Sequence, residues 1–221
     1  MIRIAVSIFL AFAVSFVAIA GNESLDIDKV NGSIHVPDSA TAGKLSTVNG
    51  SIHVGSNATV SDVETVNGGI DIGDGSNVAS LDTVNGGIHL GSKVHVAKTV
   101  EAVNGSITLA AGADVAGKAS NVNGSIQLTA AHVGGGIQTV AGDITVGADS
   151  RVENGIAVEA DHSWFHFGFT RKPRIVIGPH AVVQGDLNFK REVELFVSDS
   201  ASIGKVTGAT PTKFSGDTPP Q

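Results

Sequence analysis

Histidine and aspartate recur at one position of a short repeated phrase, and these residue types can bind metal ions. They stand between the two aliphatic residues of an Ile-x-Val or similar triplet, 18 residues apart, as His35, His53, Asp71 and His89. Imidazoles and a carboxylate on neighbouring strands could share a Zn²⁺ or Cu²⁺ ion. The column continues as Thr108 and Gln127, which fits an ordinary polar column on a solvated face. Because metal sites need ligands that converge from more than one element, we expect no metal site and no cofactor here.

A second group of candidate functional residues lies in one insertion, residues 159–173. Its binding or contact residues are Trp164, Phe165, His166, Phe167, Phe169 and Arg171. Aromatic faces stack on sugars, and Asp161 could bond sugar hydroxyls, so the insertion could form a glycan-binding shelf. It could also cover a coil end or flank, or contact a second copy of the chain. We favour the cap or contact interpretation, because exposed clusters of Trp and Phe usually end up covered.

The phrase Val-Asn-Gly-Ser-Ile, or Val-Asn-Gly-Gly-Ile, organises the first two-thirds of the chain. Its copies follow one another at steps of 18, 18, 18, 19 and 19 residues, and their asparagines are Asn31, Asn49, Asn67, Asn85, Asn104 and Asn123. A worn copy follows at residues 140–144. A period this short predicts a solenoid in which each coil contacts only its neighbours.

The Asn-Gly step is interpreted as a structural corner. We expect Gly to supply a positive φ there, and the six asparagines to form a ladder of side-chain hydrogen bonds along one edge. Four of these steps also match a glycosylation sequon, a match that a ladder corner makes incidental.

The spacing of aliphatic residues predicts an all-β fold, a parallel β-helix. Each coil carries three apolar points: one three residues before the repeated Val, one at Ile-x-Val, and one in mid-coil, as at Val60 and Val78. Three apolar points separated by Gly, Asn, Asp and Ser predict three short strands and three corners. The expected architecture is therefore a triangular solenoid of about 18 residues per coil, right-handed, with eight or nine coils.

A column of threonines beside the Asn-Gly step is expected to face outward. It contains Thr47, Thr65 and Thr83 and continues at Thr139. A flat array of threonines resembles an ice-binding face, but the adjacent column contains Glu64 and Asp82, and such charges argue against it. The preference of β-branched residues for strands explains the column more simply.

Composition narrows the range of partners. The chain has 221 residues, with 14 Lys and Arg against 21 Asp and Glu, and a net charge of −7. This balance argues against nucleic acid or an anionic membrane surface as the main partner. There is no cysteine, so disulfides and thiolate metal sites are excluded and stability must come from packing.

The chain divides into a leader, a solenoid and a tail. Residues 1–20 carry one cation, Arg3, then an apolar run that ends in Ala-Ile-Ala, the pattern of a cleaved signal peptide. An uncleaved anchor is the alternative, and after cleavage we expect no membrane span. Residues 21–209 form the predicted β-helix, and residues 210–221, rich in Thr, Pro and Gly, are predicted to be disordered.

Two stretches resemble known families. The repeat V-N-G-[SG]-I-x-[VIL] behind a signal peptide resembles secreted bacterial β-helix proteins classed as adhesins. The stretch 174–208, with Ile-Gly-Pro-His-Ala-Val-Val-Gln-Gly-Asp-Leu, resembles the bactofilins, which form cytoskeletal polymers by end-to-end stacking. The resemblance implies a β-helix and self-assembly. Bactofilins are usually cytosolic, so an exported chain departs from them.

Enzyme interpretations fit less well. Left-handed β-helix acyltransferases also use 18-residue coils, but their strict hexapeptide pattern is missing here. Polysaccharide lyases on right-handed β-helices use longer coils with carboxylate clusters on long loops.

We therefore expect a non-catalytic structural or adhesin-like protein that is exported to the periplasm or cell surface. Its expected partner is either a second copy of itself, bound end to end or laterally, or a surface glycan or protein. The alternative is a carbohydrate-binding or carbohydrate-active envelope protein that uses the insertion.

Overall fold

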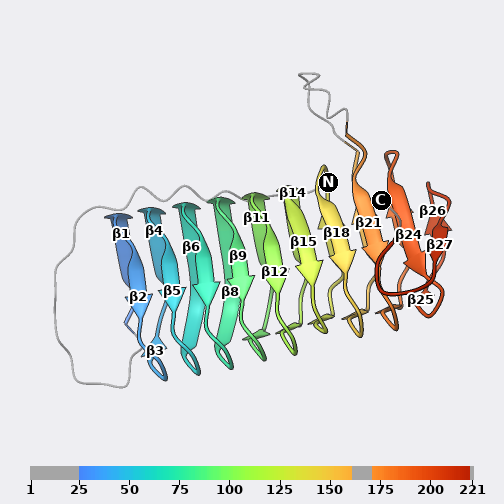
Figure 1. Cartoon of the computed structure of the whole chain (residues 1–221). Helices are drawn as coiled ribbons and strands as arrows, with labels where there is room; N and C mark the ends of the chain where they lie inside the picture. Colours follow the sequence, from blue (N-terminus) through green and yellow to red (C-terminus); the bar gives the residue numbers. More distant parts are fainter. Residues whose placement is uncertain (1–24, 161–170, 220–221) are drawn as a thin grey trace.

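The chain forms a single stack of β-coils, seen in a computed structural model that describes residues 25–160 and 171–219 (Figure 1). The described residues contain strands and turns but no helix, so this part of the chain holds no helix that could span a bilayer. All strand pairs are parallel, and paired residues lie 18 or 19 positions apart over most of the chain, as in Ile27 with Leu45. The predicted parallel β-helix is therefore confirmed.

Each coil except the last contributes one strand to each of three faces, which we number in chain order. Face 1 contains β1 (Ile27–Asn31), β4 (Leu45–Asn49), β11 (Val100–Asn104), β14 (Ala119–Asn123), β17 (Ile137–Thr139), β20 (Ile156–Val158), β23 (Leu187–Phe189) and β26 (Val206–Thr207). Face 2 is a ten-stranded sheet of β2 (Ile34–Val36), β5 (Ile52–Val54), β7 (Ile70–Ile72), β9 (Ile88–Leu90), β12 (Ile107–Leu109), β15 (Ser125–Leu128), β18 (Asp143–Val146), β21 (Arg174–Ile177), β24 (Glu194–Ser198) and β27 (Thr212–Phe214). Face 3 contains β3 (Thr41–Ala42), β10 (His95–Val96), β13 (Asp114–Val115), β16 (His132–Val133), β19 (Arg151–Val152), β22 (Val182–Val183) and β25 (Ser202–Ile203). Two long strands, β6 (Thr59–Asn67) and β8 (Asn77–Asn85), run from face 3 into face 1.

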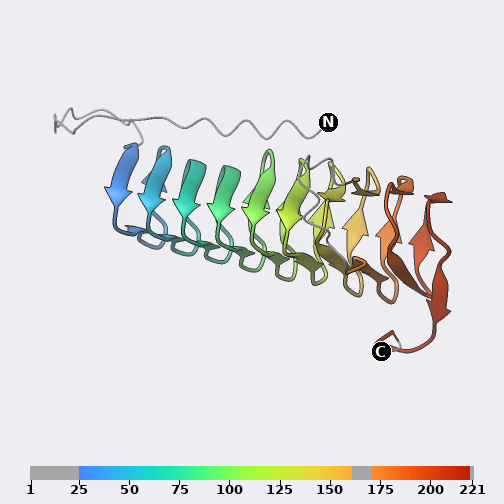
Figure 2. The same ribbon diagram turned by 90° about the horizontal axis from the view of Figure 1, so that it is seen from above.

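The coils wind in a right-handed sense. In Figure 1 the strands of face 2 run downward on the near side while the chain advances from blue to red. The ten strands of face 2 give ten coils in the described chain, more than the eight or nine expected. At a strand spacing of about 4.8 Å they form a rod about 45 Å long. Figure 2 shows the same stack from above.

The core consists of aliphatic columns, one residue per coil, that pack on the residues above and below. Face 2 supplies a column with Ile34, Ile52, Ile70, Ile88, Ile107, Ile126, Ile144 and Ile175, all almost fully buried. The mid-coil residues of face 3, including Val60 and Val78, are buried as predicted. Burying each such side chain contributes roughly 1.5–3 kcal/mol, so packing supplies the stability that disulfides cannot.

The threonine column faces inward, and the expectation that it faces outward was wrong. Thr47 is only 2% exposed, whereas the repeated valine next to it, Val48, is 37% exposed. Strand alternation explains the difference: Leu45 points into the core, so Thr47 does too, and Val48 must point out. The Thr47 hydroxyl donates to the Gly32 carbonyl at 3.1 Å, and Thr65 and Thr83 repeat this bond.

Glycine is needed at the Asn-Gly corner mainly because there is no room for a side chain. Positive φ is found at Gly32 and Gly124 of this column, but not at Gly50, Gly68 or Gly86, so the predicted reason was wrong for most copies. A Cβ on Gly68 would instead overlap the carbonyl oxygen of Gly50 one coil earlier. Successive backbones therefore touch at this corner.

Left-handed backbone lies at a different corner, between faces 2 and 3. One residue per coil has positive φ there: Ser39, Asn57, Gly75, Lys93, Gly112, Ala130, Asp149 and His180. Six of these residues are not glycine, and each carries the conformational cost of that region. The Asp38 and Asp74 carboxylates accept hydrogen bonds from the Ser56 and Ser92 amides beside this corner.

The predicted insertion and tail can be placed only in part. The segment between β20 and β21 is residues 159–173, and the coil step there is 31 residues, from Ile144 to Ile175. Residues 161–170, and the predicted signal peptide, lie outside the described residues. The prediction of a disordered tail was wrong for residues 212–214, which form β27 on β24 because Phe214 is buried against the last coil.

The two glycines of one Asn-Gly-Gly corner provide a matched test of backbone contact. A Cβ on Gly69 has no neighbour closer than 3.4 Å, whereas one on Gly68 collides with backbone. We expect Gly68→Ala to lower the free energy of unfolding by about 2–3 kcal/mol and Gly69→Ala by less than about 1 kcal/mol, because overpacking against backbone is not relieved by a rotamer change. Urea denaturation measures both, and equal losses would contradict this explanation.

Candidate functional site

The corner between faces 1 and 2 carries the predicted asparagine ladder. Each Asn side-chain amide donates to the carbonyl oxygen of the previous Asn, at 3.0–3.1 Å, along Asn31, Asn49, Asn67, Asn85 and Asn104. The backbone register continues to Asn123. The ladder is exposed, so its amides form a continuous polar edge that also presents unused hydrogen-bonding capacity to solvent.

An outward valine column runs beside this ladder on face 1. We call it the valine ridge: Val30, Val48, Val66, Val84, Val103, Val122 and Val140. Val30 is 58% exposed, Val48 and Val66 are each 37% exposed, and the later members are half-buried. A regular apolar line along a rod differs from isolated surface hydrophobic residues, and it is the form a contact surface takes.

The same face carries a column of carboxylates two residues before the ridge. Glu64, Asp82 and Glu101 are direct partners in neighbouring strands. Burial raises the pKa of the Asp82 carboxyl to about 6, and the neighbouring Glu101 and Glu64 carboxylates add to this effect. Lys44 pairs with Glu64 at 2.9 Å, and its positive charge offsets only a small part of this rise in the Asp82 pKa. Face 1 is therefore acidic as well as apolar.

The histidine column of face 2 is in register but forms only one ion pair. His35 pairs in register with His53, His53 with Asp71, and Asp71 with His89. The His53 Nδ1 lies 3.0 Å from the Asp71 carboxylate, and both side chains are about half exposed. Across the residues that the structure describes, no three His, Cys, Asp or Glu side chains converge as a metal site.

Face 3 carries a more closely bonded cluster that the sequence analysis missed. The Asp114 carboxylate lies between His95 and His132, with one oxygen 2.8 Å from the Nδ1 of His95 and the other 2.5 Å from the Nδ1 of His132. The Nε2 of His132 lies 3.4 Å from Glu153, but this contact does not have hydrogen-bond geometry. The residue before each mid-coil Val was the available signal, since it reads His, Asp, His and Arg in successive coils.

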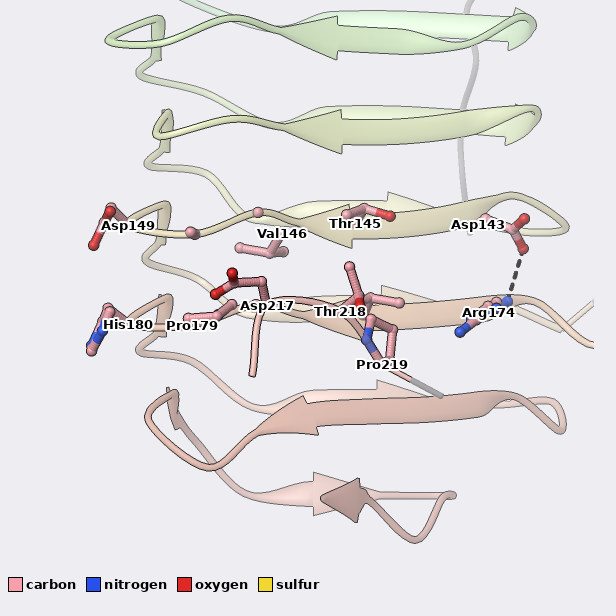
Figure 3. A pocket seen from close by; sticks show the side chains of 14 residues that line it. Asp143, Thr145, Val146, Asp149, Arg174, Pro179, His180, Asp217, Thr218 and Pro219 are labelled. Carbon is pink, nitrogen blue, oxygen red and sulfur yellow. Dashed lines mark hydrogen bonds between the residues drawn. The ribbon is translucent and has the colours of Figure 1, made fainter. Parts of the chain in front are cut away.

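A groove lies on face 2 near the C-terminal end, over β18 and β21. Its volume is about 670 Å³, and its floor includes Thr145 and Val176. Asp143 and Arg174 lie at one end, Asp149 and His180 at the other, and Asp217 to Pro219 lie across the front (Figure 3). Polar and apolar side chains therefore surround one hollow at this place.

One predicted insertion residue can be located beside this groove. The Arg171 guanidinium donates to the Asp143 carboxylate at 2.8 Å, and the Arg174 backbone amide donates to its other oxygen at 2.8 Å. Trp164, Phe165, His166, Phe167 and Phe169 lie outside the described residues. Asp143 therefore fixes the point at which the insertion rejoins the solenoid.

Comparisons with known proteins found no relative of this chain. No family model matches the chain, and no curated protein or solved structure shows a significant match.

The pKa of Asp82 predicts a pH-dependent effect of removing its charge. The folded protein loses stability as the pH rises from the ordinary pKa of an aspartate carboxyl, about 4, to the raised pKa of Asp82, about 6. We expect Asp82→Asn to leave the melting temperature unchanged at pH 4. At pH 7.5 it should raise the free energy of unfolding by about 1–2 kcal/mol after allowance for solvent exposure. An equal effect at both pH values would contradict this.

Asp114 predicts the opposite dependence. Burial acts to raise its pKa, but hydrogen bonds from His132 and His95 outweigh this and lower it overall. The stabilisation that the ionised Asp114 carboxylate provides is complete above the ordinary carboxyl pKa. It is lost as the pH falls through the lowered pKa of this group in the folded protein. We expect Asp114→Asn to cost about 1 kcal/mol at pH 7 and nothing near pH 2.5, measured by chemical denaturation. Asp199→Asn, at an exposed site, is the control, and a cost that persists in acid would argue against the ion pairs.

Proposed function

We propose that the mature chain is a non-catalytic structural or adhesin-like rod of the bacterial cell envelope, exported by its signal peptide. The observation that carries this proposal is the valine ridge beside the asparagine ladder. A rigid stack repeats the same apolar line and the same amide line in each coil that carries the Val-Asn-Gly phrase, so contacts that are weak singly add along this part of the rod. The function is presentation of these columns to a partner.

Self-assembly end to end is favoured by the two coil ends. Strands β1 and β2 at one end, and β26 and β27 at the other, have a free edge in the described chain, and such edges pair readily with further strands. Charge does not distinguish the two ends, because the first coil carries Asp26, Asp28 and Asp38 against Lys29, and residues 193–219 carry Glu194, Asp199 and Asp217 against Lys205 and Lys213.

Lateral contact would use the valine ridge, either with a second copy or with a surface protein or glycan. The carboxylate column on the same face opposes close approach of two identical faces at low salt. A second copy must therefore be offset, or the partner must be less acidic. Nucleic acid is disfavoured as a partner by the negative charge of the whole chain.

A carbohydrate-binding envelope protein is the second candidate function. The observation that favours it is the bond from Arg171 to Asp143, which brings one end of the predicted aromatic insertion to the rim of the groove. In this interpretation the insertion supplies the aromatic platform for a sugar.

The ridge can be tested by making it polar. We expect residues 21–221 to form particles larger than a monomer in light scattering, and rods or filaments by negative-stain microscopy. Val48→Ser combined with Val66→Ser should reduce the mean particle mass at least twofold, because exposed apolar area is lost without a change in the core. Val182→Ser, an outward valine on face 3, is the matched control. A monomeric wild-type chain would contradict self-assembly.

A further inference from the structure

The groove over β18 and β21 lies where the outward side chains of face 2 change from polar to apolar. The outward column of this face is polar as far as Thr145, and the next two positions in register are Val176 and Phe196. The change coincides with the coil that follows the insertion. A polar and an apolar floor residue therefore lie side by side in neighbouring coils, under the segment Asp217 to Pro219.

The positive charge at one end of the groove is balanced only in part. Asp143 accepts from Arg171 and from the Arg174 backbone, and the Arg174 guanidinium lies 4.7 Å from the centre of the Phe196 ring. Arg174 keeps its positive charge beside the ring, so the argument for an uncharged ligand comes from the carboxylates around the rest of the groove. The exposed carboxylates of Asp149 and Asp217 add negative charge elsewhere around the groove.

The remaining groups suit a ligand with many hydroxyls and apolar C–H faces. Asp149 and Asp217 offer acceptors, and Thr145 and His180 offer groups that both donate and accept. Val176, Pro179 and Pro219 offer apolar surface for the C–H faces of the ligand. Figure 3 shows Asp149 and His180 projecting from the corner at one end, with Asp217, Thr218 and Pro219 above the strands.

We propose that this groove binds a neutral oligosaccharide, with the C-terminal segment 217–219 as one wall. The volume of about 670 Å³ lies within the range of small-ligand sites. The ligand lies across neighbouring coils, its hydroxyls bonded to Asp149 and Asp217 and its C–H face on Val176. The proposal deepens the second candidate function by naming a ligand class and a site in described residues, and it does not depend on the valine ridge.

The experiment places a bulky side chain on the floor of the groove, where it would block a ligand. Thr145→Trp places a large side chain in the groove from an outward strand position, and Thr108→Trp makes the same change in the same column outside it. Binding of cellohexaose, chitohexaose and maltohexaose to residues 21–221 is measured by calorimetry, with hexagalacturonate as the anionic comparison. Circular dichroism melting shows that each variant is folded.

We expect at least one neutral hexasaccharide to bind, Thr145→Trp to weaken it at least tenfold, and Thr108→Trp to change it less than twofold. Asp217→Ala should weaken it about threefold, with Asp199→Ala as control, and this variant tests the site even if Thr145→Trp fails to fold. The proposal is overturned if no neutral hexasaccharide binds, if the two Trp variants bind alike, or if hexagalacturonate binds more tightly. Each result is separate from rod assembly, which depends on Val48 and Val66.

Discussion

Direct backbone contact between successive coils is the constraint on which the rest of this structure depends. At the Asn-Gly corner the glycine of one coil lies against the glycine carbonyl of the coil before it, with no space for a Cβ. This contact holds the register of the coils that carry the Asn-Gly phrase, and the register in turn aligns the aliphatic columns inside and the polar columns outside. The Thr47 hydroxyl and its repeats bond the same glycine carbonyls from inside the core, so the corner is held from both sides.

Because register is fixed, the outer surface is a set of columns rather than a set of independent residues. Identical or similar side chains meet at strand spacing, which is favourable for asparagine and unfavourable for carboxylates. The asparagines bond one another in a line, whereas burial, with the Glu101 and Glu64 carboxylates on either side, raises the pKa of the Asp82 carboxyl to about 6. On face 3 the same geometry alternates imidazole and carboxylate, and hydrogen bonds from both imidazoles help to lower the pKa of the Asp114 carboxyl. Stacking therefore repeats the same side-chain interaction, favourable or unfavourable, wherever neighbouring coils carry similar residues at one position.

The regular coils and the irregular region have different roles in the proposed function. Coils before residue 147 repeat one surface, which suits extended or multiple weak contacts. After the insertion the outward column of face 2 becomes apolar, the C-terminal segment folds back over it, and a local hollow forms. A site for one defined ligand fits the place where the repeat is broken, because side chains from non-equivalent positions converge there.

The sequence by itself determined the repeat, the all-β class, the parallel β-helix and the asparagine ladder, since an 18-residue period with regularly placed aliphatic residues admits few other folds. It did not determine which side of face 1 each residue occupies: Thr47 and Val48 are both compatible with a strand, and only the position of Leu45 relative to the core decides between them. The His95–Asp114–His132 cluster follows from pairing of two-residue strands too short to show alternation in the sequence. The groove arises from tertiary structure alone, because Thr145, Val176 and Asp217 come together only when the C-terminal segment packs across coils separated by the insertion.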